Sequence, residues 1–482
     1  MQIRNIAIVG GGTAGWLAAA YLSNNLQNVD ITVIDKTKGE PVGVGEGTLT
    51  NFEPFLEDCG FAKNDWFSMT EATYKSGILF PNWKGPGHTV WHPFFKSFRN
   101  AVPNISVHDL WTLNQDLDFK KYALSFYECS VDHNVVDFDN LDFYAYHVDC
   151  SKLVQFIQER IKHKINYIRQ DVVEIERQNK DITKLILKDG SIVEADLYID
   201  CTGFKSMLQP DKDKVDVTGR LFCNTAIAAH VPYEDIEKEL NPYVISEAVD
   251  HGWVWNIPVR SRIGSGLVFD RNVTDIEEAK DYFCSYWNGR ITPEDCKVID
   301  WSPYYYNDQW VGNTVAVGLS AGFIEPLEST GVSLMMASVV KLNECISDQT
   351  YNKDSVDLFN LQMRIWFEDC IDFVSMHYSE TERNTPFWNN VKENWIPSNK
   401  YKYYKETLAS TNDLIPFNGK HHDIFGGSNW STWMIQLGHP VGIRNIGVDK
   451  EQSMEILNEV YLTNEKPRSR FGRKHCDEFK QY

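Results

Sequence analysis

The sequence predicts a mixed α/β fold that opens with a strand–helix–strand unit, continues through a sheet-rich region and ends in a helical module. Residues 3–9 form a β-branched run that ends in glycines, residues 16–26 carry apolar side chains at helical spacing, and residues 31–34 have the character of a second strand. Beyond about residue 330 the apolar spacing becomes helical and stays so. These three observations define the fold class.

Further strand and helix signals fill the middle and the end of the chain. The Asp189–Gly190 pair predicts a hairpin turn. Short β-branched runs predict strands at 165–168, 172–176, 184–187 and 197–199. Apolar residues at helical spacing predict helices at 334–346, 356–376 and 388–395. We therefore expect a sheet-rich domain at 1–335 and a mainly helical module at 336–482, and we expect the basic stretch 466–480 to be a solvated tail.

Composition restricts the classes of partner. The chain has 482 residues, 43% of them hydrophobic, which is enough for a large core. Its formal net charge of −20 argues against a nucleic-acid surface, because binding phosphates needs clustered cations. No apolar run approaches the roughly 20 residues of a membrane span, and the chain starts with a strand instead of a signal peptide. We expect a soluble, cytoplasmic protein with no membrane partner.

The ten cysteines are scattered, without a CxxC pair, so we expect reduced thiols and no metal site.

The first loop carries a nucleotide-binding pattern. Glycines 10, 12 and 15 form GxGxxG between the first strand and the first helix, where the backbone approaches a pyrophosphate. Asp35 ends the next strand, about 20 residues beyond the last glycine, the distance at which an acidic residue reaches a ribose hydroxyl. The residues predicted to bind the cofactor here are Gly10, Gly12, Thr13, Ala14, Gly15 and Asp35.

Two later segments favour FAD over NAD. ADLYIDCTG at 195–203 and VAVGLSAG at 315–322 are strands that run into small-residue turns, and both resemble dinucleotide-contacting segments of flavoprotein monooxygenases. Gly318 and Ala321 are therefore added to the cofactor-binding residues. Leu319 departs from the pattern, because those enzymes usually have an Asp after the glycine. The fold implied is a flavoprotein-monooxygenase-like FAD-binding fold.

Several motifs together resemble a specific family. The chain has GGGTAGW at 10–16, GWVWNIP at 252–258, YKSGI at 74–78 followed by NW at 82–83, and FIEPLESTG at 323–331. In this combination, and over most of its length, the chain resembles the flavin-dependent halogenases of the tryptophan halogenase type. The WxWxIP signature at 253–258 is rare elsewhere.

The resemblance implies a two-component halogenase. FADH2 from a separate flavin reductase reacts with O2 to give a flavin hydroperoxide, and a halide ion, chloride or bromide, attacks it to give hypohalous acid. That acid travels to Lys75, which positions electrophilic halogen against an electron-rich arene of indole or phenol type. Glu328 either polarises the oxidant or accepts the proton that the ring loses. A separate reductase is expected because the sequence holds one complete dinucleotide fingerprint.

The resemblance also assigns the remaining site residues. It implies halide binding by Thr330 and Gly331, substrate binding by His92, Phe94 and Ser329, and a flavin-side position for Trp253 and Trp255, with the helical module covering the substrate chamber. The family's clamp for free tryptophan, a tyrosine pair, is absent from SNWSTWMIQLG at 428–438. A different indole, a phenol or another electron-rich arene is therefore expected as substrate.

Two other functions remain open at this level, an FAD-dependent aromatic monooxygenase and a non-catalytic flavin-binding homologue. Three of the assigned residues also have a non-functional interpretation. Lys75 could be a surface charge, Glu328 a helix-end residue and His92 a core residue. The oligomeric state is open, a homo-oligomer included.

Overall fold

A computed structural model describes residues 2–36, 45–94, 105–138, 141, 144–410 and 424–479. Packing divides the chain into two compact units, each assembled from three segments. Unit 1 consists of Met1–Ala72, Val148–Val217 and Trp301–Glu368. Unit 2 consists of Thr73–His147, Thr218–Asp300 and Asp369–Tyr482. The domain boundary expected between residues 335 and 336 falls within the helix Thr330–Cys345, and the expected division into two domains stays a prediction.

Unit 1 is built on a six-stranded sheet. Its strands, in spatial order, are β21 (Trp310–Val311), β22 (Thr314–Ala316), β13 (Leu197–Asp200), β1 (Asn5–Val9), β2 (Asp30–Asp35) and β9 (Asn166–Arg169). From β22 to β9 every pair is parallel, and β21 is antiparallel. Helix α1 (Thr13–Asn25) joins β1 to β2, so the predicted strand–helix–strand unit is confirmed.

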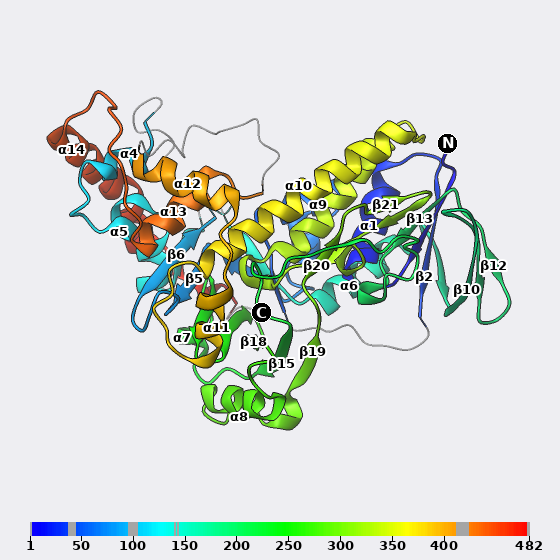
Figure 1. The fold of residues 1–482 in the computed structure, drawn as a ribbon, viewed down its shortest axis with the longest axis horizontal. Coiled ribbons are helices and arrows are strands. Elements are labelled where there is room, and N and C mark those ends of the chain that lie inside the picture. Colours follow the sequence, from blue (N-terminus) through cyan, green and yellow to red (C-terminus); the bar gives the residue numbers. More distant parts are fainter. Residues whose placement is uncertain are drawn as a thin grey trace. The chain divides into compact units, whose positions relative to one another are not determined.

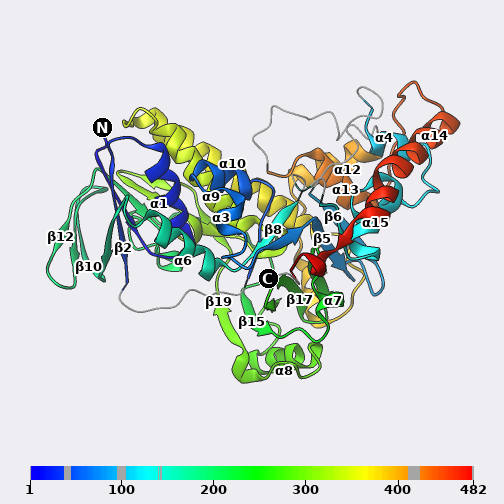
Figure 2. The ribbon, with the colours of Figure 1, turned by 180° about the vertical axis from the view of Figure 1, so that it is seen from behind.

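Helices and a second sheet complete the core of unit 1. Helix α1 contacts both α6 (Cys150–Ile161) and α9 (Thr330–Cys345), and Figures 1 and 2 show the three helices side by side. The antiparallel strands β10 (Val172–Gln178), β11 (Asp181–Leu187) and β12 (Ile192–Val193) form a second sheet beside a smaller third one. Leu185 and Leu187 of β11 join Val9, Ile34 and Tyr198 of the parallel sheet in one buried cluster. The predicted hairpin turn holds Gly190 at a φ of +85°.

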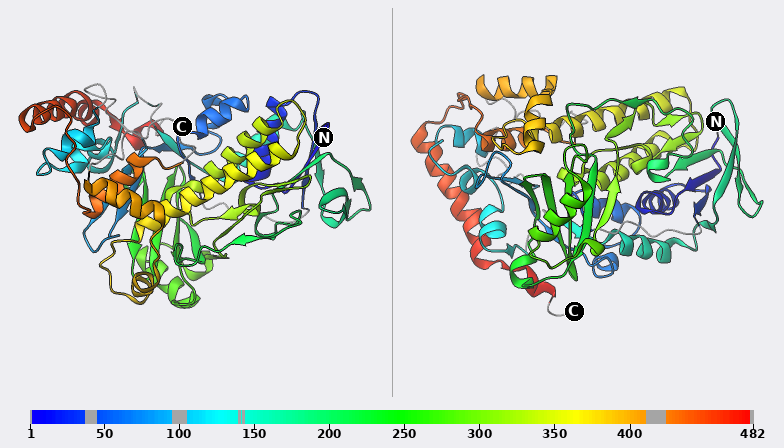
Figure 3. Two further views of the ribbon diagram at one scale, coloured as in Figure 1. Left: turned by 45° about the horizontal axis from the view of Figure 1, so that its top comes forward. Right: turned by 60° about the horizontal axis from the view of Figure 1, so that its bottom comes forward.

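Unit 2 contains a seven-stranded sheet. The strands, in spatial order, are β19 (Lys297–Asp300), β15 (Thr225–Val231), β18 (Arg262–Phe269), β17 (Gly252–Val259), β16 (Val244–Val249), β5 (Gly77–Pro81) and β6 (Thr89–Pro93). Helix α8 (Ile276–Tyr286) packs on β15 and β18 through Ala279 and Phe283. Figure 3 shows this helix and these strands, all in green, from two further directions.

The predicted change to helix beyond residue 330 is confirmed. After α9 come α10 (Lys353–His377), α11 (Pro386–Asn394), α12 (Asn399–Ser410), α13 (Gly427–Leu437), α14 (Lys450–Val460) and α15 (Lys466–Phe471). No helix in the described ranges combines the length and the low polarity that crossing a bilayer needs.

The expectation of a solvated tail at 466–480 is wrong. Residues Arg473–Lys474 form β24, which pairs with β7 (Val135–Val136), and His475 and Cys476 are buried. Arg468 donates to Asp137 at 3.0 Å and to Glu465 at 2.8 Å. Arg468 therefore has two acidic partners in the same unit, and the segment packs instead of remaining in solvent.

A close approach between β17 and β18 depends on a glycine. Trp255 lies directly opposite Gly266, and a Cβ at Gly266 would lie 2.2 Å from Cη2 of Trp255 and 2.8 Å from the carbonyl oxygen of Ile227. The indole of Trp255 is thus packed against the backbone of the neighbouring strand.

We expect Gly266→Ala to lower the free energy of unfolding by about 1–3 kcal/mol, because the added methyl overpacks the site. Gly85→Ala is the matched control, since the nearest atom to its Cβ position is Glu382 Cβ at 3.9 Å. Urea unfolding of both variants measures the difference. Equal stabilities would show that the Trp255 ring moves aside without cost.

Candidate active site

The glycine turn after β1 is fixed by contacts that leave no room for side chains. Gly10 has a φ of +117°, and a Cβ there would lie 2.1 Å from the carbonyl oxygen of Cys201. A Cβ at Gly15 would lie 1.9 Å from the carbonyl oxygen of Gly10. The Gly10 N–H donates to the carbonyl of Ile34 at 2.8 Å. The first and third glycines are therefore required by the packing of β1, β2, α1 and the end of β13.

The second glycine faces open space. No heavy atom lies within 4 Å of a Cβ placed on Gly12. Gly12 is also the residue before α1, which has no side-chain cap and no acidic residue in its first turn. Thr13 and Ala14 begin that helix. Its first N–H groups are therefore available to an anion that approaches over Gly12.

Asp35 closes the glycine turn from the end of β2. Its Oδ1 accepts the N–H of Gly11 at 3.1 Å and that of Lys36 at 2.8 Å, and its Oδ2 lies 3.5 Å from the hydroxyl of Tyr167. A Cβ on Gly11 would lie 2.2 Å from the Asp35 carboxyl carbon. The carboxylate thus lies at the turn, where the sequence placed it, and its contact with a ribose stays a prediction.

The ends of β13 and β22 meet the same turn. Buried Asp200 accepts the N–H and the hydroxyl of Thr202, at 2.9 and 2.7 Å, and the N–H of Leu208 at 2.7 Å. Gly318, just after β22, has a φ of +70°, and a Cβ there would lie 2.9 Å from the Cβ of Ala14. Three parallel strands therefore end at the start of α1, the edge at which doubly wound sheets bind ligands.

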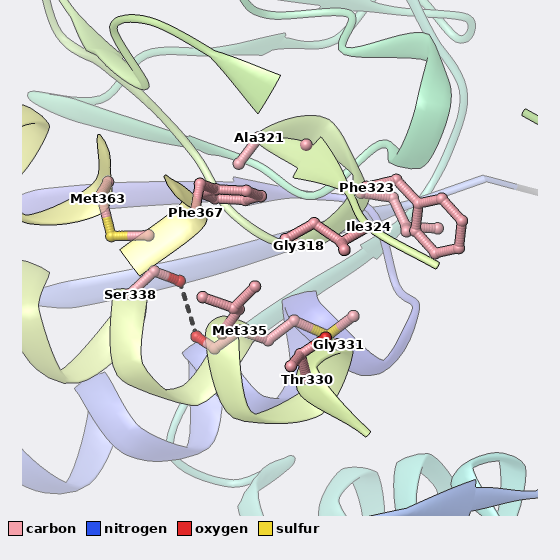
Figure 4. A pocket seen from close by; sticks show the side chains of 13 residues that line it. Gly318, Ala321, Phe323, Ile324, Thr330, Gly331, Met335, Ser338, Met363 and Phe367 are labelled. Atoms are coloured by element: carbon pink, nitrogen blue, oxygen red, sulfur yellow. Dashed lines mark hydrogen bonds between the residues drawn. The ribbon is translucent and has the colours of Figure 1, made fainter. Parts of the chain in front are cut away.

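A pocket opens beside this edge. Gly318 and Ala321, predicted to bind the cofactor, line it together with Thr330 and Gly331, predicted to bind halide (Figure 4). The structure thus brings these two predicted sets of residues together.

Sequence analysis missed the apolar wall of the pocket. Met335 of α9 and Met363 and Phe367 of α10 line it, and Figure 4 shows their side chains around the space. The sequence predicts only that these residues lie in helices. A residue that lines a pocket and a residue that fills a core share the same apolar spacing, so the pattern does not distinguish them.

The start of α9 is suited to an anion. Ser329, which precedes the helix, has a φ of +58° and makes no side-chain cap. The Thr330 hydroxyl oxygen is buried and has no hydrogen-bond partner among the described residues. A Cβ on Gly331 would meet nothing within 4 Å. Open helix N–H groups beside a buried hydroxyl can hold a halide, which is the role predicted for Thr330 and Gly331.

Glu328 lies immediately before these residues, at the end of the short 3-10 turn Pro326–Glu328. Its side chain is fully buried, and so is that of Glu325. Buried carboxylates are uncommon and mark a place where protons can be held. Sequence analysis assigned a role to Glu328 alone, and Glu325 is a second buried acid in the same segment.

The residues of unit 1 fit a flavin dinucleotide. Gly12 and the start of α1 offer an open, donor-rich surface to a pyrophosphate. The walls of the adjoining pocket are mainly apolar, which suits a flat ring system.

Lys75 lies in unit 2, on β4 (Thr73–Lys75), and its side chain is fully buried. Its Nζ lies 4.6 Å from the centre of the Phe94 ring. Just after it, β5 and β6 approach closely, since a Cβ on Gly77 would lie 2.6 Å from the carbonyl oxygen of His92. The surface-charge alternative for Lys75 therefore fails, and the structure brings Lys75 and Phe94 together.

Two buried histidines flank β4. The Tyr74 N–H donates to Nε2 of His475 at 3.1 Å, and Nδ1 of His475 bonds the carbonyl of Leu240 at 3.0 Å. Nδ1 of His147 lies 2.8 Å from the hydroxyl oxygen of Thr73. Burial lowers the pKa of His475 to about 4, so this ring is neutral. Neither histidine was predicted, because their partners are distant in sequence.

His92 lies on β6 and is buried, with Nε2 3.4 Å from the Asn429 side-chain oxygen. Its ring centre lies 5.5 Å from that of Phe373 and 6.5 Å from that of Phe425. Phe373 and Phe425 are stacked at 4.1 Å. This aromatic group can pack against a flat substrate, and the role of His92 in substrate binding stays a prediction.

Trp253 and Trp255 lie on β17, both buried, with ring centres 6.1 Å apart. Two residues apart on a strand, they share one face; their flavin-side position stays a prediction. The indole N–H of Trp255 has no hydrogen-bond partner among the described residues.

The predicted site residues are therefore divided between the units. The residues predicted to bind cofactor and halide, with Glu328 and Ser329, belong to unit 1, whereas Lys75, His92, Phe94, Trp253 and Trp255 belong to unit 2. In the described part of the chain, no group of three or more His, Cys, Asp or Glu side chains is placed to hold a metal ion.

A glycine turn between a parallel strand and an uncapped helix, with an acid closing the turn and an apolar pocket beside it, defines a dinucleotide-binding protein of the flavoenzyme class. Comparison with known proteins gives the family. The tryptophan halogenase family model matches residues 5–446. The chain belongs to the tryptophan halogenase family, and the protein is an enzyme, a flavin-dependent halogenase.

Individual relatives agree with this membership. Tryptophan 6-halogenase ThaL of Streptomyces albogriseolus is 31% identical over 425 residues, covering 81% of this chain and 79% of the relative. Tryptophan 7-halogenase RebH of Lentzea aerocolonigenes is 29% identical with the same coverage. The structure of a flavin-dependent halogenase from Xanthomonas campestris superimposes with a TM-score of 0.92 at 25% identity, covering 100% of this chain and 99% of the other.

We expect Gly12→Ala to weaken FAD binding at least about tenfold, equivalent to about 1.4 kcal/mol, while leaving the free energy of unfolding of the flavin-free protein unchanged. The methyl meets no protein atom but enters the space assigned to the pyrophosphate. Fluorescence titration with FAD and urea unfolding measure the two effects. Unaltered affinity would place the dinucleotide elsewhere.

Proposed function

We propose that this protein is a two-component halogenase in which halide is oxidised in unit 1 and the electrophilic halogen is delivered by Lys75 of unit 2. The observation that carries the proposal is the complete burial of the Lys75 side chain within the family's motif. A buried ammonium is costly, so a lysine held there serves a purpose other than solubility.

FAD, supplied as FADH2 by a separate flavin reductase, provides the reducing equivalents with which O2 converts bound halide into an electrophilic species. The residues proposed to hold the dinucleotide are Gly10, Gly12, Thr13, Ala14, Gly15, Asp35, Gly318 and Ala321. The open start of α9, with Thr330 and Gly331, supplies N–H donors that hold chloride or bromide at the pocket. Helix N–H groups favour an anion there without a formal positive charge.

Lys75 is proposed to orient hypohalous acid by a hydrogen bond or to carry the halogen as a haloamine. Its surroundings exclude bulk water, because its side chain is fully buried and the Phe94 ring lies beside the amine. Water exclusion protects an electrophilic halogen from loss before it meets the arene. Glu328, also buried, polarises the electrophile or accepts the proton that the substrate ring loses on rearomatisation.

The proposed substrate is an electron-rich arene other than free tryptophan. Helix α13 lies in the stretch comparable to the one that carries the tyrosine pair in enzymes acting on tryptophan, and it contains Trp430 and Trp433 but no tyrosine. Both indoles are fully buried, with ring centres 5.5 Å from Phe373 and 3.7 Å from His377 respectively. They pack in the core and leave no hydroxyl pair to grip an amino-acid backbone. Asn429, next to His92, is the polar group that this helix offers instead.

The assay that tests the function supplies reduced FAD, O2, chloride or bromide and a panel of indoles and phenols. Mass spectrometry then looks for the isotope pattern of the halogen in the product. Hydroxylated products alone would indicate the aromatic monooxygenase, and no product with any arene would indicate a non-catalytic homologue.

We expect Lys75→Met to lower the halogenation rate by at least about 10²-fold, because it keeps an apolar stem but removes the amine. Flavin reoxidation should continue at the parental rate, since oxidant formation precedes delivery. Stopped-flow absorbance follows the flavin, and product isotope patterns follow the halogen. A variant that halogenates at the parental rate would remove Lys75 from the mechanism.

Glu328→Gln tests whether Glu328 acts as a proton acceptor, because the substitution keeps the shape of the side chain and removes the carboxylate. We expect it to reduce kcat about 10²-fold or more with an unchanged FAD dissociation constant, because the amide preserves volume but cannot take a proton. Glu325→Gln is the comparison, since Glu325 is equally buried in the same segment. A larger loss in the Glu325 variant would reassign the role to that residue.

A further inference from the structure

His147 lies on the same face of a strand pair as Lys75. In the antiparallel pair β4 and β8 (Ala145–Val148), Thr73 is opposite His147 and Lys75 is opposite Ala145. Opposite residues share a face, and so do residues two apart on one strand. His147 is therefore the diagonal neighbour of Lys75, at about 7–8 Å between backbones, which long side chains can span. Ala145 presents only a methyl group opposite the lysine.

The hydrogen bonds fix the tautomer of His147. The Thr73 hydroxyl lies 2.7 Å from the carbonyl oxygen of Pro258 and 2.8 Å from Nδ1 of His147. A carbonyl only accepts, so the single hydroxyl proton of Thr73 goes to Pro258. Nδ1 of His147 must then donate to Thr73. In the neutral ring Nε2 carries the lone pair, and it has no hydrogen-bond partner among the described residues although it is buried.

The ring is held in that neutral form. The pKa of His147 lies well below its ordinary value, chiefly because the ring is buried. The positive charge of Lys75 and the neighbouring His475 lower this pKa further. His475 is itself neutral and uses both ring nitrogens on backbone groups. The positive charge of this group of three therefore resides on Lys75.

A buried lone pair without a partner is unfavourable unless water or another donor reaches it. The Lys75 ammonium has three donors, and the residue opposite it on the partner strand, Ala145, contributes only a methyl group.

We propose that His147 is a positioning residue for Lys75. The Nε2 lone pair of His147 accepts a hydrogen bond from the lysine amine through one bridging water. This contact fixes the direction in which the amine presents its remaining N–H groups. The proposal rests on the proposed role of Lys75 in halogen delivery. The Nδ1–Thr73 bond holds the ring, and Nε2 acts on the lysine.

A pair of substitutions separates these two nitrogen atoms. His147→Asn places an amide near Nδ1, which can still bond Thr73, but has no atom at Nε2. His147→Gln reaches the Nε2 position with an acceptor and loses the bond to Thr73. We expect His147→Asn to lower kcat at least about tenfold at unchanged KM for the arene, and His147→Gln to keep kcat within about threefold but to melt about 2 °C lower.

A second readout uses the flavin-free protein. Acceptance of a hydrogen bond stabilises the charged amine, so the pKa of Lys75 should fall by about one unit in His147→Asn and stay near the parental value in His147→Gln. NMR of protein carrying ¹³C-labelled lysine measures this titration, and ¹⁵N-labelled histidine reports a proton on Nδ1 of His147 and none on Nε2.

An unchanged Lys75 pKa in both variants, or a normal kcat in His147→Asn, would reduce His147 to a structural role and overturn the proposal. If the parental enzyme halogenates no arene, the proposed function fails, whereas the comparison of Lys75 pKa values in flavin-free protein still decides the contact between His147 and Lys75.

Discussion

The buried ammonium of Lys75 is the constraint on which the arrangement of unit 2 depends. A cation removed from water costs several kcal/mol unless its neighbours compensate. Several neutral groups lie near this amine. The Phe94 ring lies at 4.6 Å from the amine, and the histidines on either side of β4 are kept uncharged by burial. The rings that lie beside this amine therefore carry no formal counter-charge.

In unit 1 the feature suited to anions is the start of a helix. The starts of α1 and α9 both lack side-chain caps, and Gly12 and Gly331 both leave open space. In the proposed function, backbone N–H groups supply the attraction for pyrophosphate and halide. This is compatible with a chain of net charge −20, whose surface as a whole does not favour anions.

Local patterns predicted much of this structure, and distant partners account for what they missed. GxGxxG, Asp35 and the later helices are encoded within a few residues, so spacing was sufficient. Arg468 pairs with Asp137, 331 positions earlier, and a local pattern does not reveal that partner. The basic segment was therefore predicted to be solvated. The state of His147 depends on Thr73, 74 positions away, and that of His475 on Tyr74, 401 positions away. No local pattern reports such pairings.

The interleaving of the chain has a consequence for its synthesis. The parallel sheet of unit 1 receives β22 only at Thr314–Ala316, long after β1, β2, β9 and β13 have left the ribosome. During that interval the edge of β13 that will pair with β22 lacks its partner strand, and such edges can pair with other nascent chains. Slower translation at low temperature, or co-expressed chaperones, should raise the yield of native enzyme from a recombinant host.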